Sequence, residues 1–302
     1  MIRHGLESLR TIGTNPSSRA RAGRALRKYV GWQVRSRILR RTGPVPWLDH
    51  MHLQVETGEG SALAAWLPLP EFDEMMFFLL VLGEENRLID IGANIGWYTT
   101  LGAGTRGCRV HAFEPVPATF ALLEGNVRRN DLGDSVTLHP LGLSDEEGEL
   151  PFVVSGGSSV ASPLPGDEIP DGDPVRVPVR RLDDVLTPDG LPTWFKIDTE
   201  GYESHILRGA GAWLESPDTR GLVIETRGHV TRYGGSEGEL CARLAEHGFE
   251  ARRFDGVTRR LHSVDAGDLP GDTWFVRRPE TLEQELAGAP TITIDGISFP
   301  AS

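Results

Sequence analysis

The sequence predicts an α/β fold in which a mostly parallel sheet carries helices on both faces. Short apolar runs alternate with longer amphipathic stretches from Arg87 onward, and turn residues separate them. Two further apolar runs follow the last amphipathic stretch, at 249–262 and 273–277. Because parallel strands need a crossover helix between them, this alternation is typical of a doubly wound sheet.

The order of the elements follows from the apolar periodicity and from the turn residues at each boundary. Strands are expected at 87–92, 108–115, 135–142, 148–155, 193–198 and 221–226. Helices are expected at 95–104, 117–130, 203–214 and 237–248. The stretch 155–174 is rich in Gly, Ser, Asp and Pro, and we expect it to be a linker or a lid outside the core.

The chain divides into four parts by composition and pattern. We expect a basic helical arm at 1–45, a cap segment at 46–86 with a helix that stops at Gly83, the α/β domain at 87–280 and a tail at 281–302. Two cysteines, far apart in the sequence, argue against a disulfide scaffold or a thiolate metal site. No apolar run approaches the roughly 18–20 residues of a membrane span, and the start lacks the apolar segment of a secretory signal. We therefore expect a cytoplasmic protein.

Charge is unevenly placed along the chain. Residues 1–41 carry eleven Arg or Lys and one acid, a formal charge of +10, whereas the whole chain has −12 and the remainder therefore −22. The acidic body would repel phosphates, so we expect no nucleic acid there. Apolar residues at helical spacing in 26–38 predict an arm helix that docks on the body or on a second copy in a homo-oligomer. Contact with an anionic membrane surface, or with RNA, is the alternative for this arm.

A glycine-rich loop follows the first strand of the α/β domain. Asp90, Gly92, Asn94 and Gly96 form the pattern D-x-G-x-N-x-G between that strand and a helix. Glycine permits a tight turn and a close backbone approach to a ligand, and asparagine tolerates a left-handed conformation. The spacing fails the dinucleotide pattern G-x-G-x-x-G, because Trp97 stands where the third glycine belongs.

An acid closes the next strand. Glu114 follows Asp90 by 24 residues, where a carboxylate can accept hydrogen bonds from a pair of ribose hydroxyls. Loop and acid together favour a cofactor that contains a nucleoside. These residues alone leave open whether it is S-adenosylmethionine or a nicotinamide dinucleotide.

The stretch WFKIDTEGYE, at 194–203, places carboxylates at the end of another strand. Residues two apart on a strand share a face, so Lys196 and Asp198 should point the same way. A lysine beside Asp198 would hold that carboxylate ionised as a pair partner. The residues alone allow a catalytic strand end, a metal site or a charged turn.

Six motifs, in order and at matching spacing, closely resemble the FkbM family of S-adenosylmethionine-dependent methyltransferases. They are LIDIGANIGWYT, AFEPVPATFALLEGNVRRN, GLSDEEGEL, VPVRRLDDVL, FKIDTEGYESHILRGA and LVIET, within about residues 72–255. The resemblance implies a class I methyltransferase fold, a Rossmann-like doubly wound sheet of seven strands with an antiparallel C-terminal hairpin. The basic arm lies outside the match.

The resemblance also assigns the cofactor site. Asp90, Gly92, Asn94 and Gly96 match the cofactor loop, and Glu114 matches the acid that binds the ribose. Ser144 and Asp145 fall where such folds contact the adenine, although a plain turn between two strands is the alternative for them.

Candidates for the chemical step surround the strand that ends at Asp198. Asp198 is the first candidate, as an orienting carboxylate or as the base, and Glu200 and His229 are alternative bases. Asp198 and Glu225 on adjacent strand ends could instead share Mg²⁺, but no compact ligand cluster in the sequence supports this, and we predict no metal site.

The resemblance thus implies a methyltransferase that uses S-adenosylmethionine to methylate a hydroxyl of a small-molecule acceptor, such as a sugar, a glycoside or a natural-product intermediate. The alternatives are methylation of an amine or a carboxylate, or a non-catalytic protein that keeps the fold to bind a partner. A nicotinamide oxidoreductase is disfavoured by the glycine spacing.

Overall fold

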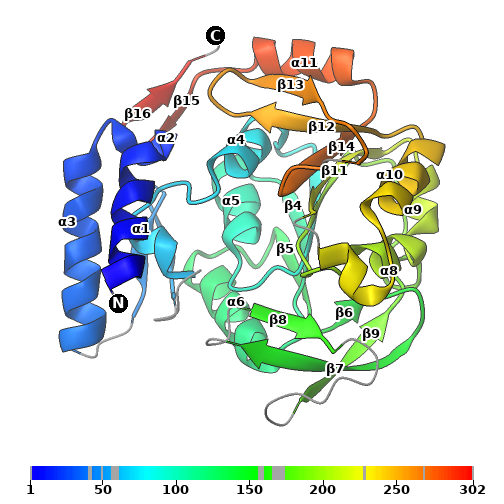
Figure 1. The fold of residues 1–302 in the computed structure, drawn as a ribbon, viewed down its shortest axis with the longest axis horizontal. Coiled ribbons are helices and arrows are strands. Elements are labelled where there is room, and N and C mark those ends of the chain that lie inside the picture. The colour runs from blue at the N-terminus through cyan, green and yellow to red at the C-terminus, as the bar shows by residue number, and fades with distance from the viewer. Residues whose placement is uncertain are drawn as a thin grey trace.

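A computed structural model describes residues 2–39, 43–48, 50–55, 61–155, 160–164, 174–226, 229–267 and 269–300. Its centre is an eight-stranded sheet with the order β13–β12–β14–β11–β10–β3–β4–β5 (Figure 1). The strands are β3 (Arg87–Ile91), β4 (Arg109–Phe113), β5 (Val136–His139), β10 (Thr193–Ile197), β11 (Thr219–Glu225), β12 (Glu250–Asp255), β13 (Arg260–Ser263) and β14 (Asp272–Val276).

The central part of this sheet is parallel and one edge is antiparallel. β10 pairs in parallel with β3 and β11, and β3 with β4 and β4 with β5. β14 runs antiparallel between β11 and β12, and β13 adds a hairpin to β12. The doubly wound sheet with an antiparallel C-terminal hairpin is confirmed, and β13 gives it one strand more than the seven expected.

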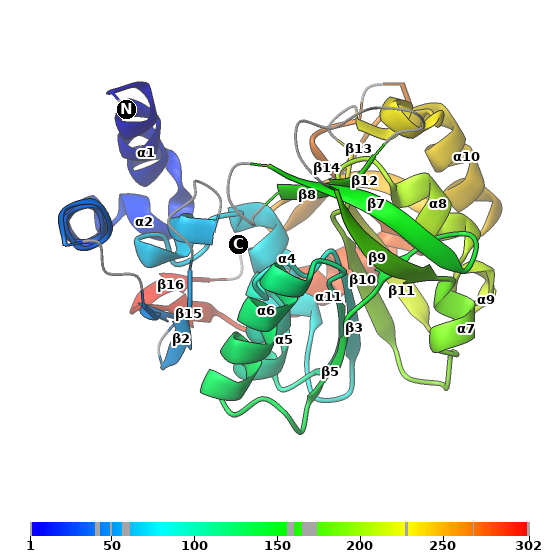
Figure 2. The same ribbon diagram turned by 90° about the horizontal axis from the view of Figure 1, so that it is seen from below.

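Two helical layers cover the sheet, as Figure 2 shows. One layer holds α4 (Phe72–Val81), α5 (Trp97–Arg106) and α6 (Pro117–Arg129), and the other holds α8 (Glu203–Arg208), α9 (Gly211–Glu215) and α10 (Glu237–Glu246). Successive residues of β10 enter opposite cores: Trp194 packs with the first layer, whereas Phe195 and Ile197 pack with the second. The expected alternation of faces along this strand is therefore confirmed.

A smaller sheet with the order β6–β9–β7–β8 stands beside the main one. Its strands are β6 (Gly142–Leu143), β7 (Gly148–Ser155), β8 (Val160–Pro163) and β9 (Val175–Arg180), and the short helix α7 (Leu182–Val185) follows. Residues 160–163 thus form a strand paired with β7, although the stretch 155–174 was expected to be a linker or lid. Residues 156–159 and 165–173 of that stretch lie outside the described residues.

The arm and the C-terminal residues lie together at one end of the molecule (Figure 1). The arm contains α1 (Ile2–Thr14), α2 (Pro16–Arg19), α3 (Ala22–Gln33) and the π-helical turn η1 (Val34–Ile38). The hairpin β1 (Val45–Trp47) and β2 (Met51–Leu53) and the turn η2 (Ser61–Ala65) lead from it to α4. The chain ends with α11 (Pro279–Gly288) and the hairpin β15 (Ile292–Ile294) and β16 (Ile297–Phe299).

None of the helices in the described ranges combines the length and the apolar character that crossing a lipid bilayer would require.

Candidate active site

A cavity of about 340 Å³ opens at the carboxyl ends of β3, β4, β10 and β11. β3 and β10 are the neighbours at which the strand order reverses, and open α/β sheets bind ligands at such a switch point. The walls come from the loops after these strands, from the smaller sheet and from the segment before α4. The volume is within the range of sites for small molecules and cofactors.

The loop after β3 forms the floor of one half of the cavity. The amides of Gly92 and Ala93 both donate to the carbonyl of Phe113, which ties the loop to the end of β4. Gly92 has a φ of +77°, and a Cβ atom there would overlap the carbonyl oxygen of Asp198. Asn94 is left-handed at φ +51° and, like Gly92, lines the cavity. Glycine is therefore required at residue 92 because the two strand ends meet there.

Asp90 and Gly96 do not line the cavity, but they support this loop. The Asp90 carboxylate is buried and accepts a hydrogen bond of 2.6 Å from the Thr99 hydroxyl in α5. Burial raises the pKa of Asp90 to about 6. Gly96 precedes α5 with a φ of +94°, and a Cβ atom there would lie 2.7 Å from Leu123. Both residues position the start of α5.

Glu114 faces the cavity from the end of β4. Its two oxygens accept hydrogen bonds from the backbone amides of Asn94, at 3.0 Å, and Val116, at 2.9 Å. The side chain is 5% exposed, and burial raises its pKa to about 7 although both amide bonds oppose the shift. The carboxylate is therefore held in one orientation by the backbone, with lone pairs left on each oxygen.

Ser144 and Asp145 lie beside the cavity without lining it, whereas Gly142 and Leu143 just before them do line it. The Ser144 hydroxyl lies 3.1 Å from the Tyr202 hydroxyl, and Asp145 forms a 2.7 Å ion pair with Arg208. Partial burial would raise the pKa of Asp145, but the hydrogen bond and charge of Arg208 outweigh it and lower that pKa.

Lys196 lies beneath the other half of the cavity, surrounded by acids. Its ammonium lies 3.3 Å from Asp198 and 5.3 Å from the centre of the Tyr98 ring, and the residue is 1% exposed. Burial alone would lower the pKa of Lys196, but the charges of Asp198 and Glu71 outweigh it and raise that pKa. The lysine is therefore a fixed positive charge under the site.

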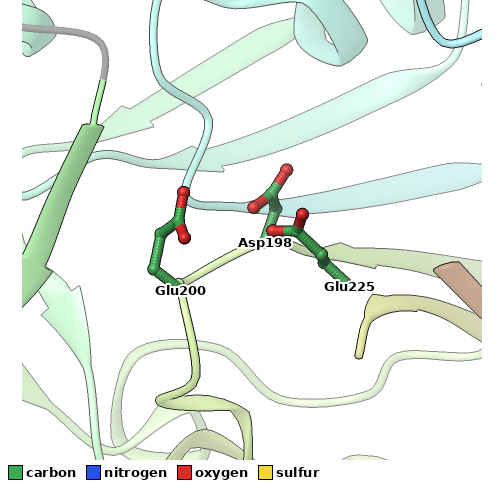
Figure 3. Close-up of side chains that lie close together, drawn as sticks. All are labelled: Asp198, Glu200 and Glu225. Atoms are coloured by element: carbon green, nitrogen blue, oxygen red, sulfur yellow. The ribbon is translucent and has the colours of Figure 1, made fainter. Parts of the chain in front are cut away.

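Glu225, at the end of β11, completes an acid pair with Asp198, and Figure 3 shows the two carboxylates facing one another. Burial, and then a hydrogen bond to Asp198, raise the pKa of Glu225 to about 9. At neutral pH Glu225 is therefore a carboxylic acid that donates to the Asp198 carboxylate. The Asp198 carboxylate therefore accepts hydrogen bonds from two side chains, the ammonium of Lys196 and the carboxylic acid of Glu225.

Glu200 stands in the turn that follows Asp198 (Figure 3). It lines the cavity and is left-handed, with a φ of +55°. The turn is held from below by Glu203, whose carboxylate accepts from the amides of Thr199, at 3.3 Å, and Gly201, at 3.0 Å. His229 begins the turn η3 (His229–Tyr233), but its side chain is not among those that the structure describes.

Oxygen atoms of Asp198, Glu200 and Glu225 lie within 4.8 Å of one another. Such carboxylate oxygens are the ligands that Mg²⁺ prefers. The chain already balances part of this charge, because Lys196 supplies a cation and Glu225 holds a proton. Lys196 and the proton on Glu225 therefore offset part of the negative charge that these three carboxylates bring together.

Glu71 is the site residue that the sequence did not indicate. It precedes α4, lines the cavity and accepts a hydrogen bond from the Tyr98 hydroxyl. Burial raises the pKa of Glu71, while the charge of Lys196 opposes the shift. The one available signal was an acid next to an expected helix start, which is commonplace.

The family described as the methyltransferase FkbM domain matches residues 90–251, just over half of the chain. Methyltransferase sdnD from Sordaria araneosa is 30% identical over 199 residues, which cover 55% of this chain and 74% of that protein. The 31-O-demethyl-FK506 methyltransferase FkbM from Streptomyces tacrolimicus is 29% identical over 193 residues, covering 54% and 72%. The hexuronic acid methyltransferase AglP from Haloferax volcanii is 29% identical over 158 residues, covering 48% and 59%. With the sheet order and the cavity at its switch point, the match shows that the chain belongs to the FkbM family of methyltransferases.

Proposed function

We propose that this protein uses S-adenosylmethionine to methylate a hydroxyl of a small molecule, such as a sugar, a glycoside or a natural-product intermediate. The observation that carries the proposal is the position of two kinds of carboxylate in one cavity. Glu114 is fixed at one strand end, and the acid pair Asp198–Glu225 lies at two others. Two relatives, one named as a methyltransferase of 31-O-demethyl-FK506 and one as a hexuronic acid methyltransferase, support a hydroxyl of a natural product or of a sugar as the acceptor.

The residues of the first half suit the nucleoside part of this cofactor. Glu114 keeps unused lone pairs on two oxygens whose direction is set by backbone amides, which fits a pair of neighbouring ribose hydroxyls. Hydrogen bonds donated to the carboxylate would favour its charged form and so lower its raised pKa. The bends at Gly92 and Asn94 bring backbone to the cavity wall without bulky side chains in between.

The bound cofactor would supply an electrophilic methyl group on a positively charged sulfur. Carboxylates of the chain favour a cation in the cavity, and Asp198 and Glu200 line it directly. Holding two reactants in line can supply up to roughly 7–11 kcal/mol of the barrier reduction. Binding and orientation are therefore the main tasks of these residues.

The acceptor hydroxyl must also lose its proton, and the acids divide this work unequally. Glu225 holds a proton at neutral pH and is a poor base. Asp198 is paired with Lys196 and accepts from Glu225, which makes it weakly basic but well placed to orient a hydroxyl. Glu200 and His229 remain as candidate bases, and the side chain of His229 is not among those described. We favour Glu200 as the proton acceptor because it lines the cavity, and Asp198 as the residue that orients the acceptor.

The far wall of the cavity is apolar. Leu150, Phe152 and Pro163 come from the smaller sheet, and Leu63 comes from η2. A wall of this kind fits an acceptor with an apolar face beside its hydroxyl groups. Acceptor choice would then depend on the segments outside the main sheet.

Isothermal titration with S-adenosylhomocysteine tests the cofactor assignment. We expect binding by the wild-type protein and an affinity about 10- to 100-fold lower in Glu114→Gln, because a hydrogen bond to a charged group contributes about 1.5–3 kcal/mol. Glu124→Gln, on the exposed side of α6, is the matched control and should bind as the wild type does. Absent binding by the wild type, or equal binding by a folded Glu114→Gln variant, would exclude the proposed cofactor site.

A further inference from the structure

Exposed large apolar side chains gather on the N-terminal arm. Of the seven that the structure records among its described residues, six belong to the arm, and Val257 is the exception. The six are Leu9, Leu26, Val30, Val34, Ile38 and Leu39. Ile38, at 72% exposed, is the most open of them. Clusters of exposed apolar side chains on a protein surface mark sites that contact a partner protein, a ligand or a membrane.

Four of these side chains form a stripe along the outer face of α3 and η1. Leu26, Val30, Val34 and Ile38 recur at every fourth residue, so they share one side of the helix. We call these four residues the apolar stripe. The opposite side of α3 is turned inward, where Trp32 is buried. In Figure 2 α3 is seen end-on at the outer edge of the molecule, and no other described element covers its outer side.

The C-terminal hairpin and Trp66, which follows η2, hold the inward side of α3. Arg21 donates to the carbonyls of Asp295, at 2.8 Å, and Gly296, at 2.9 Å. Lys28 forms a 3.3 Å ion pair with the Asp295 carboxylate. Tyr29 packs edge-on against Trp66 with 5.1 Å between ring centres. The helix is therefore anchored in one rotation, and the apolar stripe is fixed facing outward.

Basic residues flank the apolar stripe. Arg27 and Arg37 are exposed and lie three residues from Val30 and Val34, which makes them neighbours on the helix surface. The arm as a whole has a formal charge of +10, opposite in sign to the rest of the chain. Apolar side chains with arginines beside them fit the boundary between the headgroups and acyl chains of an anionic bilayer.

We infer that the outer face of α3 and η1 docks this protein on an anionic lipid surface, with the apolar stripe inserted and Arg27 and Arg37 on the headgroups. A second copy of the chain fits this face poorly, because a symmetric contact would place arginines against arginines. RNA fits it poorly as well, because the aromatic residues of α3, Tyr29 and Trp32, pack inward and leave no stacking surface on this described helix.

Vesicle flotation of the full chain tests the docking surface. Vesicles of phosphatidylcholine with about 30% phosphatidylglycerol should carry the protein, and pure phosphatidylcholine vesicles should not. Arg27→Gln with Arg37→Gln should lower the partition coefficient by roughly 25-fold, since each basic residue near the surface contributes about fivefold. Val30→Ser with Ile38→Ser removes the centre and the most exposed end of the apolar stripe and should abolish flotation. Val257→Ser and Arg243→Gln are matched controls, exposed but outside the arm, and should float as the wild type does.

Three results would overturn the inference. The first is no flotation with anionic vesicles, and the second is an equal loss in the Val257→Ser or Arg243→Gln controls. The third is that the arm variants instead abolish a dimer in sedimentation or a shift of labelled RNA in a gel, which would assign the face to a second copy or to RNA. None of these results depends on catalysis, so the docking surface and the proposed methyl transfer fail independently.

Discussion

The two halves of the cavity hold their carboxylates in different ways. At the ends of β3 and β4, Glu114 is fastened by two backbone amides. At the ends of β10 and β11, Asp198 is held by two side chains, the buried Lys196 and the protonated Glu225. The backbone amides fix the orientation of the Glu114 carboxylate. The ionisable side chains fix the orientation of the Asp198 carboxylate and also its charge and the position of the neighbouring proton.

The two kinds of support suit the two halves of the cavity to different tasks. A group whose direction is set by the backbone is preorganised for binding, because little freedom remains to be lost when a ligand arrives. Asp198 lies between a lysine and a carboxylic acid, which keep it negatively charged and fix its hydrogen bonds. Under the proposed function, such a preorganised charge can stabilise a transition state. Under the proposed function, we call the ends of β3 and β4 the binding half and the ends of β10 and β11 the reacting half, and substitutions can separate the two.

The largest effect is expected at Asp198. Under the proposed function, Asp198→Asn should lower kcat about 10³-fold, because it removes the carboxylate that orients the acceptor. The dissociation constant for S-adenosylhomocysteine should change by less than about threefold, since Glu114 and the glycine loop remain. Turnover assays and titration calorimetry on the same preparation measure both quantities.

Glu200→Gln distinguishes orientation from proton transfer. Loss of a base should lower kcat and leave the KM for the acceptor unchanged, whereas loss of an orienting group should also raise that KM. Asp134→Asn, which changes an exposed acid before β5, is the control for Glu200→Gln.

The Asp198→Asn variant has an outcome that would contradict its prediction. Equal losses of kcat and of cofactor affinity would assign Asp198 to the binding half.

A smaller effect is expected where the halves meet, at Gly92. Gly92→Ala would force a Cβ atom into the Asp198 carbonyl at a φ that L-residues rarely adopt. We expect it to lower the free energy of unfolding by about 3 kcal/mol and to weaken cofactor binding as well. Chemical denaturation would measure the first effect.

Gly125→Ala is the control for that substitution. Gly125 lies within α6, and a Cβ atom added there would meet no other group within 4 Å. Alanine at this helical position should therefore stabilise the protein by about 0.5–1 kcal/mol. A Gly92→Ala variant as stable as the wild type would mean that the two strand ends can move apart.

Much of this site follows from the sequence because local pattern encodes it. The alternation of strands and helices gives the parallel sheet, and the 24-residue spacing brings Glu114 to the strand end beside the loop. The turn after β10 likewise delivers Asp198 and Glu200 to the same edge. Strand ends in a parallel sheet converge, so their residues can be grouped without knowing any contact in detail.

Other parts depend on contacts between distant segments, which periodicity does not encode. Glu71 reaches the site only because α4 packs on α5, which places Tyr98 beside it. Asp90 precedes the loop in sequence, yet its side chain turns beneath it to Thr99. The proton on Glu225 follows from burial beside Asp198, and burial is a property of the folded chain.

The smallest effect, at Glu225, tests the reacting half most directly. The folded-state pKa of Glu225 is raised to about 9, whereas an unfolded chain has a glutamate pKa near 4.3. Between these values only the unfolded state releases the proton, so this residue makes folding less favourable as the pH rises through that window. A glutamine side chain has no proton to release there and can still donate to Asp198, so Glu225→Gln should remove this loss.

We expect Glu225→Gln to match the wild type at pH 5 and to be more stable by about 1 kcal/mol at pH 8, a small gain because solvent screens a partly exposed group. Calorimetry at the two pH values measures it, with Glu124→Gln as the exposed control. Lower stability of Glu225→Gln at pH 8 would mean that Glu225 is charged in the folded protein. Two charged carboxylates, Asp198 and Glu225, would then require a cation besides Lys196 to balance them. The reacting half would in that case bind a cation, and the two carboxylates would not share a proton.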